Sequence, residues 1–459
     1  MTNKSSENWR IKSQLANFWH VEGERVQCDL CPRHCKLKPD QKGFCQVRGN
    51  VNGELHTYNY GISVQATIEN IETEAVNHYR PGAKILSMGN VGCMMNCSFC
   101  QNWQTSQVKH LNDKNVNVYS PQEVIDLALK NNIGIISWTY NDPVVWQEFV
   151  VDTSKLAKEH GILTLYKSAL YIEEAPLKEL IEVIDIFSIS LKGMDPVMYK
   201  KQTKGELAPV LERIKLISQS DRHLEISQLI VTDLNDDTDN AQKTALWIKE
   251  NVGSHVPLHL VAYHPAYRYT KERTGIDTLL KLRKIVLEYG LEYCYLGNVY
   301  ADNVSNTNCK KCERILVQRF GLSIEVIGLD KAGSCISCGE PSTVIDAHGG
   351  ISEKLIVPDF LPKQSQEFKW NKEVNSIHII VDEKHIDTFL KIERNPGKKI
   401  EFLKITEGLE RLIISKSTGD EEDIKIMSDI ATDIEFLPVL DRAHFPVQHK
   451  SIASNKYLN

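Results

Sequence analysis

The sequence has no long apolar run, no excess of basic residues and no apolar segment near its first residue. No stretch approaches the roughly twenty consecutive apolar residues that a membrane-spanning helix needs. The opening residues, MTNKSSENWRIKSQ, lack the apolar core of a signal peptide. The formal net charge is −6, whereas proteins that bind nucleic acid non-specifically usually carry a basic surface. We therefore expect a cytoplasmic protein that neither enters the membrane nor takes nucleic acid as its main partner.

Eleven of the twelve cysteines are gathered in three groups. The groups are Cys28, Cys31, Cys35 and Cys45; Cys93, Cys97 and Cys100; and Cys309, Cys312, Cys335 and Cys338. Cys294 stands alone in an apolar run, which is typical of a buried structural thiol. Because cytoplasmic thiols are kept reduced, grouped cysteines indicate metal sites rather than disulfides.

Between about residues 84 and 300, apolar runs alternate with amphipathic segments. Strands are expected over 84–89, 133–140, 162–169, 185–193, 224–232, 257–265 and 292–300, and helices over 121–132, 143–160, 175–184, 208–219, 241–252 and 277–290. Ser120 to Glu123 reads as a capping box, with Pro121 at the first helical position. This alternation predicts an α/β fold with a parallel sheet, as a full or partial TIM-type β/α barrel. An open, doubly wound sheet is the structural alternative.

The flanking regions have a different character. We expect a cysteine-rich, metal-binding N-terminal region over 1–75, the barrel over 76–305, and a zinc-ribbon-like or rubredoxin-like module over 306–345. Residues 350–459 contain no cysteine. They combine strand-like runs at 376–382, 399–405 and 411–416 with helix-like runs at 383–393 and 421–431, which predicts a small α+β domain of unknown role.

The middle cysteine group has only three members. They lie directly after the first predicted barrel strand, where loops of a β/α barrel carry the chemistry. A structural zinc site would need four ligands. Three thiolates instead leave a [4Fe–4S] cluster with one iron open for a substrate or cofactor. Three unrelated buried cysteines are the alternative, but this spacing rarely arises by chance.

The spacing of Cys93, Cys97 and Cys100, with Phe99 before the last cysteine, resembles the signature of the radical S-adenosylmethionine (SAM) enzymes. Further segments, at 28–48, 79–107, 263–267 and 295–300, are similar to the AmmeMemoRadiSam branch, whose members look like pyruvate formate-lyase activating enzymes. The resemblance implies that SAM chelates the open iron. Reduction of the cluster would then cleave SAM to a 5′-deoxyadenosyl radical that abstracts a hydrogen atom.

The resemblance also implies particular cofactor-binding residues. Tyr140, Asn141 and Asp142 match a motif that contacts the amino group of SAM, although Asp142 is equally well explained as a helix cap before Pro143. Lys192 is expected to pair with the SAM carboxylate, with a surface lysine as the alternative. His264 is expected to face the site, with a structural histidine as the alternative.

Two departures from the activating enzymes stand out. The fourth barrel strand ends in Ser190-Leu191-Lys192, where these enzymes usually have an acid in place of the serine. The third ends in YKSAL, where relatives tend to have an Asn-Gly turn. Lys167 and Ser168 are thus predicted to point into a site that differs from that of the glycyl-radical activators, although Lys167 also reads as a surface lysine.

The two outer cysteine groups each supply four thiolates. Cys309, Cys312, Cys335 and Cys338 form two C-x-x-C pairs, a pattern that indicates a structural metal site with zinc or iron. Cys28, Cys31, Cys35 and Cys45 are compatible with either a second iron–sulfur cluster or a structural zinc ion.

We therefore expect a radical SAM oxidoreductase of the activating-enzyme type, with its substrate undetermined. Modification of a peptide or RNA is the nearest enzymatic alternative, and a non-enzymatic iron- or zinc-binding scaffold is the other. Expected partners are an electron donor of the flavodoxin or ferredoxin type, and a Memo-like protein or a protein substrate.

Overall fold

The computed structural model describes residues 9–299, 301, 303–320 and 323–349, and beyond these seven separate strands. These strands are β19 (Gln364–Lys369), β20 (Ser376–Val381), β21 (Thr388–Arg394), β22 (Lys399–Ile405), β23 (Arg411–Ser415), β24 (Asp423–Ser428) and β25 (Ile434–Val439). In the described part of the chain, no helix has both the length and the apolar character to cross a membrane.

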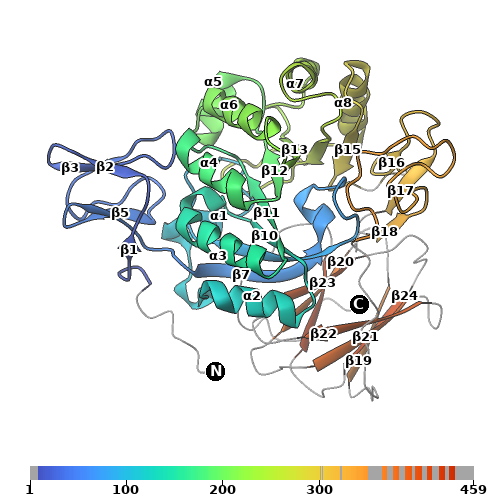
Figure 1. Ribbon diagram of the computed structural model, residues 1–459, viewed down its shortest axis with the longest axis horizontal. Helices are drawn as coiled ribbons and strands as arrows, with labels where there is room; N and C mark the ends of the chain where they lie inside the picture. Colours follow the sequence, from blue (N-terminus) through green and yellow to red (C-terminus); the bar gives the residue numbers. More distant parts are fainter. Residues whose placement is uncertain are drawn as a thin grey trace.

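A curved parallel sheet forms the centre of the molecule (Figure 1). Its strands are β8 (Lys84–Asn90), β10 (Ile135–Thr139), β11 (Leu163–Ser168), β12 (Ile186–Ser190), β13 (His223–Ile230), β14 (Leu258–Ala262) and β15 (Cys294–Gly297). Each strand pairs in parallel with the next one in this order. Because the order follows the sequence without a reversal, the sheet is a partial β/α barrel and not the doubly wound alternative.

Amphipathic helices connect these strands and cover the outside of the sheet (Figure 1). They are α2 (Pro121–Lys130), α3 (Gln147–Glu159), α4 (Glu174–Val183), α6 (Leu207–Ser218), α7 (Thr238–Asn251) and α8 (Ile276–Glu288), with α5 (Pro196–Thr203) as a short addition before α6. The predicted capping box of α2 is present, with Ser120 and Glu123 satisfying each other's backbone N–H groups. The helix buries Val124, Ile125, Leu127 and Ala128 against the sheet.

The N-terminal strands form a lobe of their own on one side of the sheet (Figure 1). They are β1 (Gln14–Leu15), β2 (Trp19–Glu22), β3 (Arg25–Cys28), β4 (Lys36–Leu37), β5 (Arg48–Val51) and β6 (Glu54–Thr57). In the β5–β6 hairpin, Asn52 and Gly53 both have positive φ angles, 52° and 89°. This is the conformation that an Asn-Gly turn favours.

A buried ion pair fastens this lobe to helix α3. The guanidinium of Arg48 donates to both carboxylate oxygens of Glu148, at 2.9 and 3.0 Å, and the two side chains are only 2% and 6% exposed. Arg48 also donates to the carbonyl of Asn17, whose own N–H donates to Glu148 at 2.8 Å. The pair therefore joins three segments that are distant in the sequence.

The strand β7 (Ile62–Asn70) links the barrel to the C-terminal strands. It runs antiparallel to β8 on one edge and pairs with β23 on the other. Strand β20 then lies between β23 and β25, while β19, β24, β21 and β22 form a second sheet. The barrel sheet thus continues directly into the C-terminal part of the chain.

The helices predicted over 383–393 and 421–431 are wrong in the residues that the structure describes, 388–393 and 423–428. The structure has strands β21 and β24 there, and alternate residues are buried: Leu390 and Ile392 in β21, Ile424 and Ile426 in β24. Apolar residues at every second position favour a strand, and this period overrides the helix-forming charged residues around them. The other residues of the two ranges lie outside the described part of the chain. The strands predicted over 376–382, 399–405 and 411–416 are confirmed as β20, β22 and β23.

Replacing Glu148 with alanine is expected to destabilise the protein by about 3–5 kcal/mol, because it leaves the buried charge of Arg48 unpaired. Urea unfolding followed by circular dichroism measures the change. The control is Glu174→Ala, which removes an exposed ion pair with Lys178 and should leave the unfolding curve in place. Identical curves for Glu148→Ala and the unchanged protein would contradict the anchoring role.

Candidate active site

The three middle cysteines line one wall of a cavity of about 360 Å³ inside the barrel. Cys93, Cys97 and Cys100 lie in the loop that follows β8, at the carboxyl end of the central strands. In β/α barrels this is the end at which the loops converge. The predicted position of the triplet at the mouth of the barrel therefore agrees with the structure.

The loop is held in place by hydrogen bonds from buried asparagines. The side chain of Asn90 donates to the carbonyls of Val91, Gly92 and Asp142, at 3.2 to 3.4 Å. The side chain of Asn59 donates to the carbonyl of Val91 at 3.1 Å. These bonds fix the path of the backbone just before Cys93.

Gly92 allows the N-terminal lobe to pack directly against this loop. Its φ angle is +87°, and a Cβ atom at this position would lie 2.9 Å from the side chain of Val47 and 3.0 Å from the carbonyl oxygen of Cys45. Any residue with a side chain would therefore push the lobe away from the loop. The close approach matters because it brings two cysteine groups next to each other.

The thiols of the triplet lie in surroundings that disfavour a free thiolate. Desolvation raises the pKa of Cys93 and of Cys100, and it raises the pKa of Cys97 to about 12 although the ammonium of Lys192 opposes it. The thiol of Cys93 accepts from the N–H of Met95 at 3.3 Å, and that of Cys100 lies 3.4 Å from the hydroxyl of Ser106. Since thiolates are the form that binds metal, a bound cation must supply the missing stabilisation.

Tyr140 and Asn141 lie beside the triplet at the end of β10. The hydroxyl of Tyr140 donates to Glu69 at 2.8 Å, and its carbonyl accepts from the side chain of Asn102 at 2.6 Å. The side chain of Asn141 donates to the carbonyl of Asn90 and accepts from the hydroxyl of Thr105 at 3.0 Å. Both residues line the cavity and brace the loop that carries the cysteines.

Asp142 caps the short helix at Pro143–Trp146 and also faces the cavity. Its carboxylate accepts from the N–H of Val144 at 3.3 Å, from the hydroxyl of Ser168 at 2.8 Å and from the N–H of Ala169 at 2.7 Å. Burial raises the pKa of the carboxyl in spite of these bonds. The predicted cap is therefore present, and the carboxylate also joins the ends of β10 and β11.

Lys192 and His264 follow the later strands β12 and β14, but His264 is not among the residues that line the cavity. Lys192 lines the cavity, and its charge lowers the pKa of the neighbouring Cys97 thiol. A nitrogen of His264 lies 3.0 Å from the side-chain nitrogen of Gln101, the residue after Cys100. The loop of His264 also contacts the cysteine loop through Tyr267, whose ring stacks on Trp103 at 5.3 Å.

The reading of Lys167 as a surface lysine is wrong. Its ammonium lines the cavity and donates to the carbonyl of Glu74 at 3.0 Å, to Ser188 at 3.0 Å and to Ser227 at 2.9 Å. Desolvation, helped by the charge of Lys192, lowers the pKa of Lys167 to about 8. Desolvation together with the neighbouring Glu69 raises the pKa of Glu74 to about 7. The interior of the barrel is thus polar, and its charges are poorly solvated.

The acidic wall of the cavity is the main feature that sequence reasoning missed. Glu69, Glu72 and Glu74 come from β7 and the turn after it, and all three are buried. The hydroxyl of Thr139 donates to Glu74 at 2.8 Å. Three acids within six residues of the segment IENIETEA, among apolar residues, were the available signal, because buried carboxylates need partners.

His78, Glu225 and Arg319 belong to a buried network that borders the cavity, and Arg319 itself lines it. Glu225 accepts from the N–H groups of Asn77 and His78, at 2.9 and 2.7 Å, and pairs with His259 at 2.7 Å. Desolvation lowers the pKa of His78 to about 3, so this imidazole is neutral. Arg319 comes from β17 (Ile315–Phe320) and donates to the carbonyl of Asn77 at 2.6 Å.

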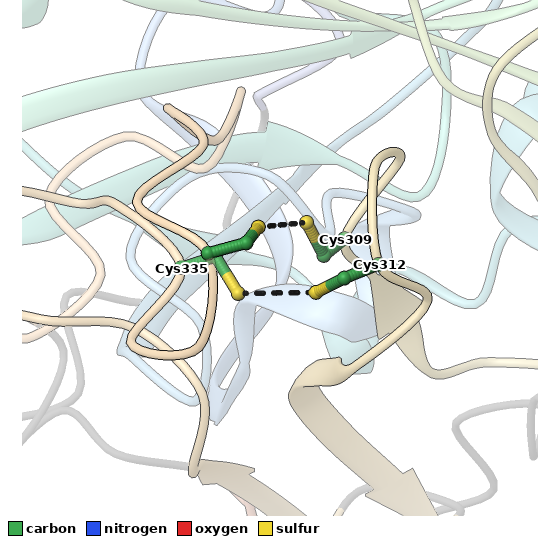
Figure 2. A group of neighbouring side chains, drawn as sticks. Cys309, Cys312 and Cys335 are labelled. Atoms are coloured by element: carbon green, nitrogen blue, oxygen red, sulfur yellow. Dashed lines mark hydrogen bonds between the residues drawn. The ribbon is translucent and has the colours of Figure 1, made fainter.

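The third cysteine group forms a compact site for a single ion (Figure 2). The sulfur atoms of Cys309, Cys312, Cys335 and Cys338 all lie within 4.8 Å of one another, and the pairs Cys309–Cys338 and Cys312–Cys335 are both 3.6 Å apart. A Zn–S bond of about 2.3 Å places tetrahedral sulfur ligands roughly 3.8 Å apart. The geometry therefore fits one metal ion.

Two matching turns shape this metal site. Glu313 and Gly339 follow the second cysteine of each pair and have φ angles of +60° and +71°. Burial acts to raise the pKa of Cys335, but backbone N–H groups and neighbouring thiols lower it to about 7. Such turns aim N–H groups at the sulfurs and favour the thiolate that a metal binds.

The N-terminal cysteines surround a second, much smaller cavity. Cys28, Cys31, Cys35 and Cys45 line a space of about 20 Å³ together with Met94, which belongs to the cysteine loop of the barrel. The structure therefore brings the four predicted ligands together, next to the main site.

Comparison with known proteins places this architecture in a family. The model of the radical SAM superfamily matches residues 87–248, which include the triplet and the strands around it. An uncharacterised protein of Methanocaldococcus jannaschii is 35% identical over 327 residues, covering 71% of this chain and 97% of its own. The chain belongs to the radical SAM superfamily.

More distant relatives of this radical SAM protein have named activities. A pyruvate formate-lyase-activating enzyme of Listeria monocytogenes is 22% identical over 199 residues, covering 40% of this chain and 77% of its own. A (2S)-3-sulfopropanediol dehydratase activating enzyme of Klebsiella oxytoca is 24% identical over 123 residues, which are 27% of this chain and 39% of that enzyme.

Membership in the radical SAM superfamily implies a [4Fe–4S] cluster and SAM as cofactors. The residues of the main cavity fit these groups. Cys93, Cys97 and Cys100 offer three thiols on one wall, and the carboxylate of Asp142 and the ammonium of Lys192 lie on the same cavity. This donor set matches a cluster with one open iron and a ligand that carries both an amino and a carboxylate group.

Replacing Cys312 with serine is expected to remove one metal equivalent per chain while leaving the acid-labile sulfide unchanged, because this group holds an ion and not a cluster. Elemental analysis and a sulfide assay measure both quantities. Lys311→Ala, in the same turn, is the matched control and should retain the metal. A metal content that is unchanged in Cys312→Ser would contradict the site.

Proposed function

We propose that this radical SAM enzyme abstracts a hydrogen atom from a protein substrate, in the manner of the activating enzymes. The observation that carries the proposal is that one cavity contains both the three thiols and, deeper in the barrel, a polar inner wall formed by Lys167, Ser227 and His259. Cluster and SAM can occupy the cysteine side, and a substrate group can reach the side of Lys167, Ser227 and His259. The named activities of the relatives support a protein substrate.

When bound, the reduced cluster and SAM supply a 5′-deoxyadenosyl radical, and the protein residues position both cofactors. We infer that Tyr140, Asn141 and Asp142 present oxygen atoms to the SAM ammonium, and that Lys192 pairs with its carboxylate. His264 is proposed to set the orientation of Gln101 beside Cys100. The barrel excludes water from the space between cluster and substrate.

The inner wall differs from what the activating enzymes suggest. Ser190 stands where those enzymes usually carry an acid, and its hydroxyl lies 3.4 Å from that of Ser227. The buried carboxylates of Glu69 and Glu74 line the same cavity. We infer that these acids, rather than an acid on β12, contact the substrate. The recognised group would then carry hydrogen-bond donors or a positive charge.

We also propose that the protein belongs to the AmmeMemoRadiSam branch and that it has two kinds of partner. Similarity of the motifs at 28–48 and 263–267 to the AmmeMemoRadiSam branch supports a Memo-like partner, and cluster reduction requires a donor of the flavodoxin or ferredoxin type. We also propose the organisation into regions 1–75, 76–305, 306–345 and 350–459, and a cytoplasmic location, where thiols stay available for metals. Modification of a peptide or RNA is the alternative outcome of the same chemistry.

Anaerobic, reduced protein incubated with SAM is expected to form 5′-deoxyadenosine, and Cys97→Ala should abolish this product because the cluster is lost. Liquid chromatography with mass spectrometry measures it. Cys294→Ala is the matched control: this cysteine is buried in β15 away from the cavity lining and should be dispensable. Absence of the product from unchanged protein with an intact cluster would refute the enzyme in favour of a metal-binding scaffold.

Replacing Lys192 with alanine is expected to raise the KM for SAM about ten- to a hundredfold, the effect of losing a hydrogen bond to a charged group. Initial rates of 5′-deoxyadenosine formation at varied SAM concentration give KM and kcat. Lys201→Ala, an exposed lysine on α5, should leave both constants unchanged. An unchanged KM in Lys192→Ala would exclude the contact with the SAM carboxylate.

A further inference from the structure

The four N-terminal cysteines are arranged around one small cavity. All four line it, from strand β3, from the turns that follow and from the segment before β5. Cys28 is buried, and the N–H of Cys28 donates to the carbonyl of Cys35 at 3.0 Å, which closes the loop around the cavity. The sequence alone left iron–sulfur cluster and zinc as equal alternatives.

The spacing of the sulfur atoms separates these alternatives. Within the described residues, the group of Cys309 is the one set of three or more His, Cys, Asp or Glu ligand atoms that all lie within 4.8 Å of one another. The four N-terminal sulfurs do not meet this limit. One tetrahedral ion needs sulfurs roughly 3.8 Å apart. A cluster attaches each thiolate to a different iron, and its ligand sulfurs therefore stand farther apart.

The barrel triplet provides a reference within the same structure. Cys93, Cys97 and Cys100 bind the cluster that the family implies, and their sulfurs also fall outside the 4.8 Å limit. Neither the N-terminal group nor the triplet meets the limit for a single ion, and both differ in this from the compact group at Cys309. Unlike the triplet, the N-terminal group has four cysteines, enough to saturate a cluster.

The position of this group next to the barrel loop suggests its role. Met94, between Cys93 and Cys97, lines the N-terminal cavity, and its carbonyl accepts from the guanidinium of Arg33 at 2.5 Å. The carbonyl of Cys45 packs against Gly92, the residue before Cys93. Only one layer of residues therefore separates the two cysteine groups, and electron transfer between metal centres is fastest over such short separations.

We propose that Cys28, Cys31, Cys35 and Cys45 ligate a second, fully coordinated [4Fe–4S] cluster that relays electrons to the barrel cluster. A reduced low-potential flavodoxin or ferredoxin gives up one electron to the N-terminal cluster, which passes it on. The electron then reduces the sulfonium of SAM, whose S–C5′ bond breaks to give methionine and the radical. The ligand assignment stands independently of the proposed function, whereas the relay rests on it.

The ligand assignment is tested on the full chain with Cys93, Cys97 and Cys100 all replaced by alanine. After anaerobic iron–sulfide reconstitution, we expect about four irons and about four acid-labile sulfides per chain to remain. Adding Cys31→Ser and Cys35→Ser should remove them. Sulfide is the decisive count, because the group of Cys309 can also bind iron. Zinc without sulfide would overturn the assignment, and about two sulfides would overturn its four-iron form.

A spectroscopic measurement on the unchanged protein covers the case in which the triple variant does not fold. Two reduced-cluster signals are expected in electron paramagnetic resonance, and SAM should shift only one of them, since the N-terminal cluster has no open iron. A single signal that shifts completely with SAM, together with about four sulfides per chain, would overturn the assignment.

The relay is tested with the Cys31→Ser/Cys35→Ser variant and two reductants. With reduced flavodoxin, we expect formation of 5′-deoxyadenosine to fall more than tenfold, whereas with dithionite it should stay within about twofold of the unchanged protein. Equal rates with both reductants, or equal losses with both, would overturn the relay. If the unchanged protein forms no product with either reductant, the proposed function fails, and the sulfide count still decides the site.

Discussion

The active site depends on the hydrogen bonds that hold the backbone between β8 and Cys93. Asn90 ends a fully buried stretch of strand and donates to three carbonyls of the loops around it, while its own carbonyl accepts from Asn141. The carbonyl groups at this point have left the sheet and lack water, so each needs a partner. The amide side chain of Asn90 thereby fixes the cysteine loop and the β10 loop to one another. The side chain of Asn59, which follows β6, bonds the same backbone at Val91.

Much of the barrel could be predicted because the sequence patterns that specify it are formed by residues close together in the chain. Continuous apolar runs, the capping box at Ser120 and the spacing of Cys93, Cys97 and Cys100 each specify their structure within a few residues. The helices expected over 383–393 and 421–431 failed for the opposite reason. There, charged residues with high helix propensity interrupt a two-residue apolar period, and the antiparallel pairing of β21 with β24, which are distant in the sequence, decides in favour of strands.

The polar interior could not be predicted, because it is assembled from distant segments. Lys167 looks like an ordinary strand-end lysine until the carbonyl of Glu74, more than ninety positions earlier, is placed beside it. The same holds for Glu225, whose partners include His259 and the backbone at Asn77 and His78 besides the nearby His223. Sequence reasoning finds motifs whose members are neighbours, and these groups become neighbours only in the folded chain.

The outlying parts of the chain also belong to the site. The sheet does not close between β15 and β8 in the described strands, so other segments must complete the wall of the cavity. Arg319 comes from the metal-binding module and is buried against Asn77, and Tyr79 forms a bridge to Ile345 of the same module. His378 of β20 lines the cavity from the C-terminal strands. A metal ion bound at Cys309 would therefore stabilise a module that supplies part of the cavity wall, and through this module it would influence the active site.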